Sequence, residues 1–462
     1  MSSILREWQK LCIERALRHF LVNKHFFCQA TPGAGKTRMA GELAKELLNK
    51  NAIDLVLCFA PSCQVVDGFR NTLSKILGRR MDGYVGAIGD ACTYQGMDAK
   101  GEEFWELFQQ YRVLAIFDEI HHCAGYDLKT SNTWGSTIIS KIQNQATFTL
   151  SLSGTPWRTD DKAIALGRYS APTRTLTCNY RYGLQQAIVD SVCRSPRITL
   201  IDNHNLQLIQ KKQQNRQVSN FDNFAHLLDS SPLCFEDILW NEDIIDHMLD
   251  LGCRKLAQLR KRIPSAAGLI VATDTNHAKL IESKLLSRGE NCRVATTKTG
   301  SAQDNINEFR SGIGCWIIAV GMISEGTDIP RLQVCCYLSR IRTELHYRQV
   351  LGRILRRTGI NDDQAWLFVI AEPSLIDYSR RISEDLPQDL AVVSRKTAPR
   401  FEEQKALIGW ENNNIDNWST FKSDNDLPSK VDYLVTVPRL LSPTTYELGV
   451  SSQFRSELLE IL

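Results

Sequence analysis

Two short stretches of the sequence combine residue types that phosphate chemistry uses. The first, ATPGAGKT at residues 30–37, has glycines at 33 and 35 that let the backbone turn its NH groups toward an anion. Lys36 can then reach the β- and γ-phosphates of a nucleotide, and the hydroxyl of Thr37 can bind magnesium. The sequence therefore predicts an ATP-binding loop formed by Thr31, Pro32, Gly33, Ala34, Gly35, Lys36 and Thr37.

The second stretch, FDEIHHCAG at residues 117–125, places two carboxylates beside two histidines and a cysteine. A phosphate-binding loop needs a carboxylate on a neighbouring strand to hold magnesium, and Asp118 ends a predicted strand. Glu119 is placed to orient or deprotonate an attacking water. A zinc site made of the histidines and Cys123 is disfavoured, because consecutive side chains point in different directions. We therefore expect Thr37 and Asp118 to bind Mg²⁺.

Short apolar runs precede these motifs and would position them. The runs are HFFCQA, IDLVLCFA, VLAIFD and FTLSLS, and helical stretches such as RMAGELAKELLNK separate them. Such runs are typical of strands buried on both faces of a parallel sheet, where ligands bind beyond the carboxyl ends of the strands. After a polar stretch the pattern restarts with GLIVATD, WIIAVGMISEG, VCCYLSR and AWLFVIAEP, which predicts a second lobe of the same α/β class.

These patterns predict four parts of the chain. A first lobe should cover residues 1–195, a partly helical connector 196–265 and a second lobe 266–385. Residues 386–462 have weak periodicity, and we expect them to form an accessory or docking segment for a protein partner.

The composition of the 462 residues is that of an ordinary globular protein, with 43% apolar residues and a net charge of +3. This mild positive charge permits a nucleic-acid partner without identifying one. The 14 cysteines are scattered without a CxxC pair, which disfavours a zinc module. Because no signal peptide and no long apolar run is seen, we expect a cytoplasmic protein without a membrane segment.

The phosphate loop, DEIH at 118–121, SGTP at 153–156 and QVLGRILRR at 349–357 follow one another in the order found in superfamily 2 helicases and translocases. The sequence resembles that superfamily over about residues 4–372, and most of all its DExH branch, which holds the XPB-type and restriction-subunit-type DNA helicases. The resemblance implies two tandem RecA-like lobes with an ATP cleft between them. It also implies an ATP hydrolase that uses magnesium.

The resemblance assigns roles to matching positions. It places Arg6 and Gln9 of LREWQ near the adenine base and makes His121 a coupling residue between the nucleotide site and the second lobe. Ser153 and Thr155 would link hydrolysis to movement of the nucleic acid. In the second lobe, the implied nucleotide-site residues are Gly326, Asp328, Gln349, Arg353 and Arg356, with the two arginines sharing one helix face and reaching the γ-phosphate.

Hydroxyl and amide side chains at corresponding loops suit contacts to phosphate and sugar. The predicted nucleic-acid contacts are Pro61, Ser62, Gln64, Thr93, Tyr94, Gln95, Thr273, His277, Thr296 and Thr297.

The function favoured by these features is movement along DNA driven by ATP, in a setting of repair, restriction or antiviral defence. A DExH RNA helicase, and an ATPase switch that is stimulated by nucleic acid without separating strands, remain open alternatives. After SGTPW the sequence reads Arg158, Thr159, Asp160, whereas XPB-type proteins carry Arg, Glu, Asp in a motif tied to DNA opening. The missing acid puts that particular function in doubt.

Overall fold

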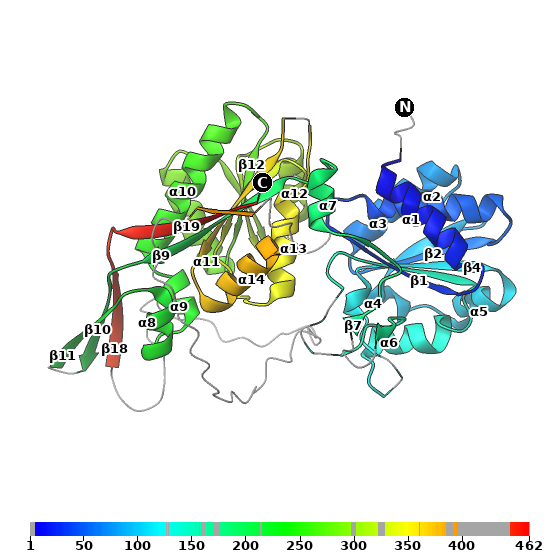
Figure 1. Cartoon of the computed structure of the whole chain (residues 1–462), viewed down its shortest axis with the longest axis horizontal. Coiled ribbons are helices and arrows are strands. Elements are labelled where there is room, and N and C mark those ends of the chain that lie inside the picture. The colour runs from blue at the N-terminus through cyan, green and yellow to red at the C-terminus, as the bar shows by residue number, and fades with distance from the viewer. Residues whose placement is uncertain are drawn as a thin grey trace.

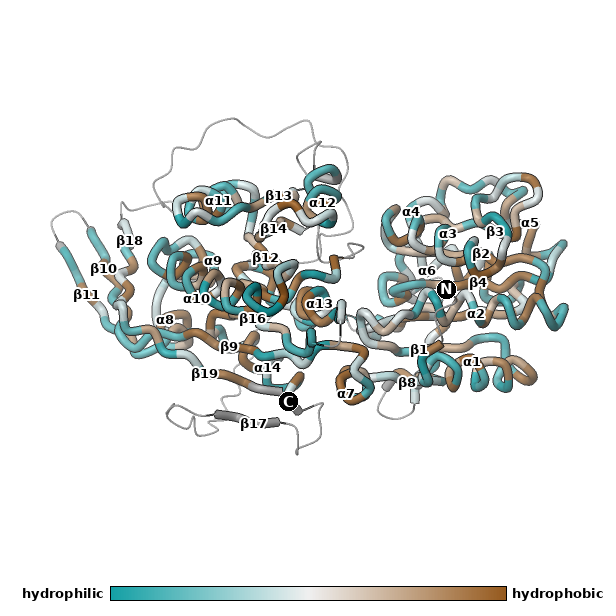
Figure 2. Tube along the Cα trace, turned by 90° about the horizontal axis from the view of Figure 1, so that it is seen from above, coloured by the Kyte–Doolittle hydropathy of each residue, from teal (hydrophilic) through white to brown (hydrophobic). Residues whose placement is uncertain are grey.

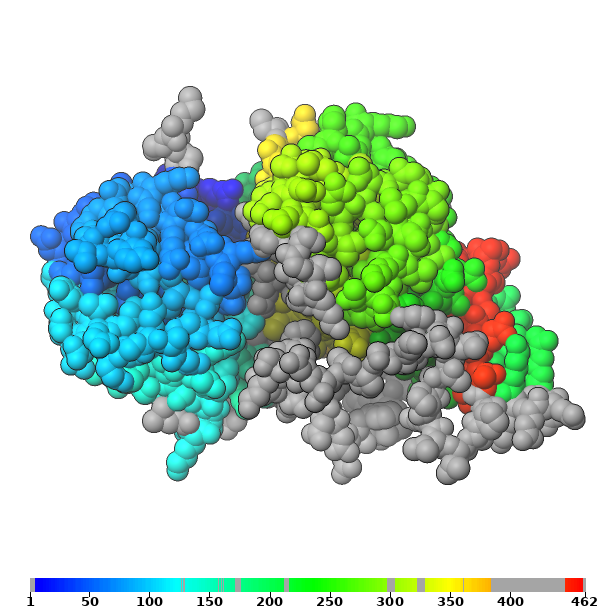
Figure 3. Space-filling view, turned by 180° about the vertical axis from the view of Figure 1, so that it is seen from behind, coloured from blue at the N-terminus to red at the C-terminus, as the bar shows by residue number. Residues whose placement is uncertain are grey.

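The protein was analysed as a computed structural model in which two lobes lie side by side (Figure 1). The structure describes residues 5–125, 127, 129–156, 158, 160, 162–170, 175–212, 215–296, 302–321, 329–359, 361–384, 391–394 and 444–461. The space-filling view shows the first lobe, in blue and cyan, and the second lobe, in green and yellow, as two bodies that meet along one side (Figure 3).

The first lobe is built on a parallel sheet with the strand order β3-β2-β4-β5-β1-β8. The strands are β1 (His25–Ala30), β2 (Leu55–Ala60), β3 (Gly89–Thr93), β4 (Val113–Asp118), β5 (Phe148–Ser153) and β8 (Tyr180–Tyr182). Every residue of β4 is buried, and its alternate side chains enter two different hydrophobic clusters. Both faces of the sheet are therefore covered, as the apolar runs predict.

Helices on the two faces of this sheet supply that cover. One cluster takes in α1 (Glu7–His19), α2 (Lys36–Asn49) and α3 (Cys63–Leu77), and the other takes in α4 (Tyr94–Met97) and α5 (Glu102–Gln110). The smaller elements of the lobe are η1 (Ile120–His122), α6 (Thr133–Thr137), η2 (Ile138–Ile142), β6 (Tyr169–Ser170), β7 (Thr175–Leu176) and α7 (Leu184–Val189).

The second lobe holds a sheet with the order β13-β14-β12-β15-β16-β9-β19-β17. Its parallel strands are β9 (Ser195–Asn203), β12 (Ala267–Val271), β13 (Cys292–Thr296), β14 (Trp316–Val320), β15 (Leu332–Tyr337) and β16 (Gln364–Ile370). The antiparallel strands β17 (Ala391–Ser394) and β19 (Phe454–Ile461) extend it. The helices are α10 (Glu242–Arg260), α11 (Thr275–Ser287), α12 (Ala302–Arg310), α13 (Glu344–Ile354) and α14 (Pro373–Glu384).

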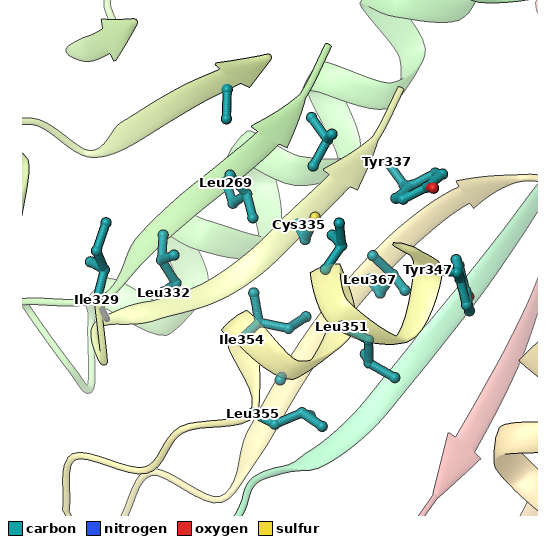
Figure 4. Close-up of a cluster of buried hydrophobic side chains, with 14 of the residues drawn as sticks. Leu269, Ile329, Leu332, Cys335, Tyr337, Tyr347, Leu351, Ile354, Leu355 and Leu367 are labelled. Carbon is teal, nitrogen blue, oxygen red and sulfur yellow. The ribbon is translucent and has the colours of Figure 1, made fainter. Parts of the chain in front are cut away.

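Helix α13 packs on this sheet through buried leucine, isoleucine and tyrosine side chains (Figure 4). Leu351 and Ile354 face Cys335 and Leu367 of the strands below. This packing determines which side of α13 is left to face the first lobe. The two parallel sheets confirm the expected α/β fold with tandem RecA-like lobes.

A small third sheet projects from the second lobe, on the side away from the first lobe (Figures 1 and 2). It pairs β10 (Leu206–Lys212) with β11 (Asn215–Phe221) and with β18 (Thr444–Val450), all antiparallel. The short helices α8 (Phe224–Ser230) and α9 (Phe235–Leu239) follow β11 in the chain.

Two of the expected boundaries need correction. Residues 196–265 are not a separate connector, because β9 pairs with β16 from Ser195 to Ile201 inside the second sheet. The end of the 386–462 segment is likewise not a detached accessory part, because β19 pairs with β9 from Phe454 to Glu460. The pairing of β19 with β9 joins residues about 250 positions apart, as in the hydrogen bond from Asn203 Nδ2 to the carbonyl oxygen of Ser451. Local periodicity carries no information on such partners.

Among the helices that the structure describes, none combines the length and apolar character needed to cross a membrane.

Candidate active site

The phosphate loop joins the carboxyl end of β1 to α2. Gly33 and Gly35 have φ values of 80° and 94°, in the left-handed region that glycine enters without strain. Helix α2 starts at Lys36 directly after Gly35, so its first free NH groups face the loop. The Lys36 Nζ lies 3.2 Å from the Ala30 carbonyl oxygen and 3.3 Å from Glu119 Oε1. The strand, loop and helix therefore have the arrangement that a nucleotide phosphate site requires.

Helix α1 holds the loop from its outer side. Arg6 Nη1 donates to the carbonyl oxygen of Ala34 at 2.6 Å, and Gln9 Nε2 donates to that of Gly35 at 3.0 Å. The Arg6 backbone NH donates in turn to Gln9 Oε1, which fixes the start of the helix. Both residues thus touch the predicted ATP loop, while their place beside an adenine base stays a prediction.

Asp118 ends β4 at the edge of the sheet where the phosphate loop lies. Its side chain is only 8% exposed, and Oδ1 has no hydrogen-bond partner among the described residues. Burial, and then the neighbouring charge of Glu119, raises the pKa of this carboxyl group. A buried carboxylate oxygen without a donor is expected where a cation and its water shell bind, so this residue fits the predicted magnesium ligand.

Glu119 is held in one orientation by four groups. Its oxygens lie 3.3 Å from Lys36 Nζ, the Ser153 hydroxyl and the Gly154 NH, and 3.4 Å from His121 Nδ1. Its φ of 49° is left-handed, a strained value for a residue with a side chain. Burial alone would raise the pKa, but the positive charge of Lys36 and then His121 outweighs it and lowers the pKa of Glu119. An ionised carboxylate in a fixed position suits a water-orienting base.

Behind Glu119, side chains of β5 and the following turn connect to the DExH turn. His121 Nδ1 lies 2.9 Å from Ser153 Oγ, which also accepts the Thr155 NH at 3.1 Å. Arg158 donates to the His121 carbonyl oxygen and forms a two-pronged ion pair with Asp160, with hydrogen bonds of 2.7 Å and 2.6 Å. The residues predicted to couple the site are thus in one bonded chain, while coupling itself stays a prediction.

The second lobe brings Arg353 and Arg356 to the phosphate loop. A Cβ built on Gly33 would lie 2.9 Å from Arg356 Cγ, and one on Gly352 would lie 2.8 Å from Pro32 carbons. Burial and the charge of Glu119 raise the pKa of Asp118, and the charge of Arg353 opposes part of that rise. Burial lowers the pKa of Arg356 to about 10. Gln349 lies one helical turn before Arg353 in α13.

One expectation about these arginines is wrong. They do not share one helix face, because α13 ends at Ile354 and Arg356 pairs with Cys193 in an antiparallel bridge. The backbone NH of Arg194 also donates to the Leu355 carbonyl oxygen at 2.7 Å, so residues after Ile354 are drawn out of the helix. Arg356 therefore reaches the loop from an extended segment.

Several predicted nucleic-acid contacts are buried. Tyr94 is fully buried under β4 and donates to the Asp118 carbonyl oxygen at 2.7 Å. His277 is also fully buried, packs against Trp240 with the two rings tilted by 36°, and accepts the NH of Thr273. Both side chains make internal hydrogen bonds, which burial of a polar group requires, and their direct contact with a strand stays a prediction.

The other predicted nucleic-acid contacts differ in how far their side chains are exposed. Thr273 and Thr296 are buried, and Thr93 caps α4 by accepting the Gly96 NH at 2.9 Å. Pro61, Ser62 and Gln64 are partly exposed at the start of α3 and Gln95 is exposed, so contact through these stays a prediction. Gly326, Asp328 and Thr297 lie outside the described residues.

Sequence reasoning missed two supports of the site. The hydroxyl of Tyr94 holds the backbone at Asp118, and Arg158 holds the backbone at His121. Neither Tyr94 within TYQ nor Arg158 after SGTPW carries a local signal of its role, because each binds a backbone oxygen far along the chain.

Comparisons with known proteins agree with this geometry. Residues 2–158 match the family model described as type III restriction enzyme, res subunit. An uncharacterized protein of Mycobacterium tuberculosis is 28% identical over 396 residues, which cover 80% of this chain and 62% of that protein. The chain thus spans somewhat less than two thirds of the length of this relative.

Two further proteins are similar over most of the chain. The DNA 3′-5′ translocase XPB2 of Sulfurisphaera tokodaii is 24% identical over 409 residues, covering 82% of this chain and 84% of that protein. The solved fragment of an HsdR subunit of a type I restriction enzyme from Vibrio vulnificus aligns with a TM-score of 0.55 at 16% identity. That alignment covers 81% of this chain and 65% of the fragment. The family model thus matches the part of the chain that holds the phosphate loop and the DExH turn, and the similarity to XPB2 and to the fold of the HsdR fragment extends over most of the chain.

Proposed function

We propose that this protein hydrolyses ATP between its two lobes and uses the cycle to move along DNA. The observation that carries the proposal is the approach of Arg356 to the phosphate loop, because the second lobe then supplies positive charge to a nucleotide bound by the first. A planar guanidinium suits the charge that spreads over the phosphoryl oxygens in the transition state.

In the proposed reaction the phosphate loop binds ATP through its NH groups and Lys36. Glu119, ionised and held by Ser153 and Gly154, orients the water that attacks the γ-phosphate. Thr37 and Asp118 would hold magnesium, which when bound with ATP neutralises phosphate charge. Arg353 and Arg356 would stabilise the transferring group from the other side of the cleft.

Movement would follow from the same contacts. The arginines favour the closed lobes only while the γ-phosphate is present, so hydrolysis weakens the closure and allows the lobes to separate. A strand that contacts both lobes would be displaced in each cycle. Pro61, Ser62, Gln64 and Gln95 are the proposed contacts on the first lobe. DNA is proposed over RNA because the similar archaeal protein is a DNA translocase. The match to a restriction subunit favours a restriction or defence setting.

The test is ATP turnover titrated separately with single-stranded DNA, duplex DNA and RNA. DNA should raise kcat several-fold, and RNA should not; stimulation by RNA alone would favour the RNA helicase instead. Strand displacement on tailed duplexes then separates unwinding from translocation.

Lys36→Ala should abolish turnover and keep the folded far-UV circular dichroism spectrum, because the contacts of the lysine head group with the described residues are to Ala30 and Glu119 at the site itself. Lys45→Ala is the matched control, since Lys45 is an exposed lysine on the same helix. Full activity in Lys36→Ala would refute the proposed site.

A further inference from the structure

Arg194 is a completely buried arginine whose guanidinium meets five oxygen atoms. Nε donates to Asp362 Oδ1 at 2.6 Å and Nη2 to the other carboxylate oxygen. The other donors reach the carbonyl oxygens of Pro330 at 2.8 Å, Ile354 at 2.7 Å and Leu332. Guanidinium has five N–H groups, so each finds an acceptor.

The acceptors of Arg194 surround the segment that carries the arginines of the second lobe. Ile354 is the last residue of α13, and its carbonyl is one that a helix end leaves without an internal partner. Leu332 is the first residue of β15, the strand on which α13 packs, and Pro330 lies two residues before it (Figure 4). Arg194 thus joins the end of the helix to the sheet beneath it.

Asp362 extends this connection to the far side of Arg356. Its Oδ2 accepts both the NH of Thr358, at 2.8 Å, and the Thr358 hydroxyl, at 2.7 Å. Arg356 therefore lies between two anchored points, Ile354 and Thr358, that are attached to one buried ion pair, and Arg353 directly precedes the first of them.

The segment just before Arg194 also contacts the first lobe. Cys193, next to Arg194, bridges to Arg356 through its backbone and donates its thiol to the carbonyl oxygen of Pro32 at 3.5 Å. A buried ion pair is weak evidence for stability alone, because desolvation offsets most of its attraction. Fixing the position of nearby groups is the better-supported use of such a pair.

We propose that Arg194 and Asp362 are positioning residues for ATP hydrolysis, which hold Arg353 and Arg356 at the distance from the phosphate loop that the reaction needs. This inference rests on the proposed ATPase function. In this role Arg194 touches no substrate and acts through the backbone on each side of Arg356.

Arg194→Lys tests the proposal, because lysine keeps the charge opposite Asp362 but cannot make the fork of five hydrogen bonds. We expect kcat to fall about 100-fold, as for a catalytic group displaced by about 1 Å. Binding of a fluorescent ATP analogue should stay within about twofold of wild type, since the phosphate loop belongs to the first lobe.

Arg331→Lys is the matched control in the same lobe. Arg331 also binds backbone carbonyl oxygens, those of Phe309 at 2.9 Å and Gly314 at 2.8 Å, and neither of these is an acceptor of Arg194. We expect Arg331→Lys to lose about as much thermal stability as Arg194→Lys and to keep the wild-type kcat. If both variants lose kcat equally, Arg194 is merely structural and the proposal fails.

A double-mutant cycle with Arg356→Ala separates positioning from general damage. If Arg194 acts through Arg356, Arg194→Lys should lower kcat by less than about threefold in the Arg356→Ala background. A full 100-fold loss in that background would overturn the proposal. Thr358→Val is a milder variant at an exposed residue and should lower kcat about fivefold, the effect of one hydrogen bond. If Arg194→Lys does not fold, Thr358→Val tests the proposal in its place, and an unchanged kcat in Thr358→Val would overturn the proposal.

The two proposals fail in different ways. Wild-type protein without ATP turnover under any nucleic-acid condition would refute the proposed function. Wild-type turnover with an unaffected Arg194→Lys variant would refute only the positioning role.

Discussion

Replacing Gly352 by alanine should raise the stability of the second lobe and lower its catalytic output. Gly352 lies inside α13 and faces the first lobe, and a Cβ there would lie 2.8 Å from both Cβ and Cγ of Pro32. Alanine fits the helical backbone, so the added methyl group changes only the contact between the lobes.

The two effects have opposite signs and can be estimated separately. Alanine in a helix is more favourable than glycine by about 1 kcal/mol, which should raise the free energy of unfolding. Carbon atoms in contact normally lie about 3.5–4.0 Å apart, so closure with the methyl group present requires the lobes to separate by about 1 Å. A displacement of this size at a catalytic arginine lowers kcat about 100-fold.

The assay pairs ATP turnover with urea unfolding on the same protein samples. Gly68→Ala is the matched control, because Gly68 lies inside α3 and a Cβ there meets no atom within 4 Å. It should gain about the same stability and keep wild-type kcat. Wild-type kcat in Gly352→Ala would show that the lobes do not need the observed contact with Pro32, and the arrangement of the arginines would have to be reconsidered.

Three further substitutions test other parts of the structure. Glu119→Gln should lower kcat by about 10²–10⁴ with ATP binding retained, because glutamine cannot accept the proton of the attacking water; near-normal single-turnover rates would contradict this. Asp118 has its pKa raised from 3.8 to about 7 by burial and the charge of Glu119, so the nucleotide-free wild type should lose stability as pH rises through that interval. Asp118→Asn should remove this dependence and be more stable than the wild type at pH 8 by roughly 4 kcal/mol in urea titrations, at about 1.4 kcal/mol per pH unit of that interval. Leu459→Ala, at a buried residue of β19, should lower the free energy of unfolding by about 2–3 kcal/mol. The control Ser456→Ala, on the exposed side of the same strand, should change it by less than about 0.5 kcal/mol. Equal effects of the two substitutions would mean that β19 is not part of the second lobe.

The parts of the site that the sequence predicts well are those made by neighbouring residues. The phosphate loop needs glycine at positive φ and a helix that starts at Lys36, and both requirements appear within eight residues. Asp118 follows a fully apolar strand, so its place at the edge of the sheet follows from periodicity alone. In such cases the residue type, the backbone conformation and the position share one local cause.

The parts that the sequence did not predict depend on partners far along the chain. Tyr94 and His277 are polar residues in loop-like contexts, yet Tyr94 is buried with its hydroxyl on the Asp118 carbonyl oxygen, and His277 is buried against Trp240. The strand β9 was taken for a connector because its pairing with β16 and β19 is visible only in the folded sheet. Burial and pairing of this kind cannot be read from residue type.

Arg356 shows how the two kinds of information combine. Its spacing of three from Arg353 predicts a shared helix face, and an isolated helix would obey that rule. The backbone bridge to Cys193 and the bond from Arg194 to Leu355 override it, because pairing with the segment that leaves the first lobe satisfies carbonyl groups that the helix end exposes. The motif therefore supplies the guanidinium, whereas the connection between the lobes decides where it lies. A change in that connection should alter catalysis even when every motif residue is intact.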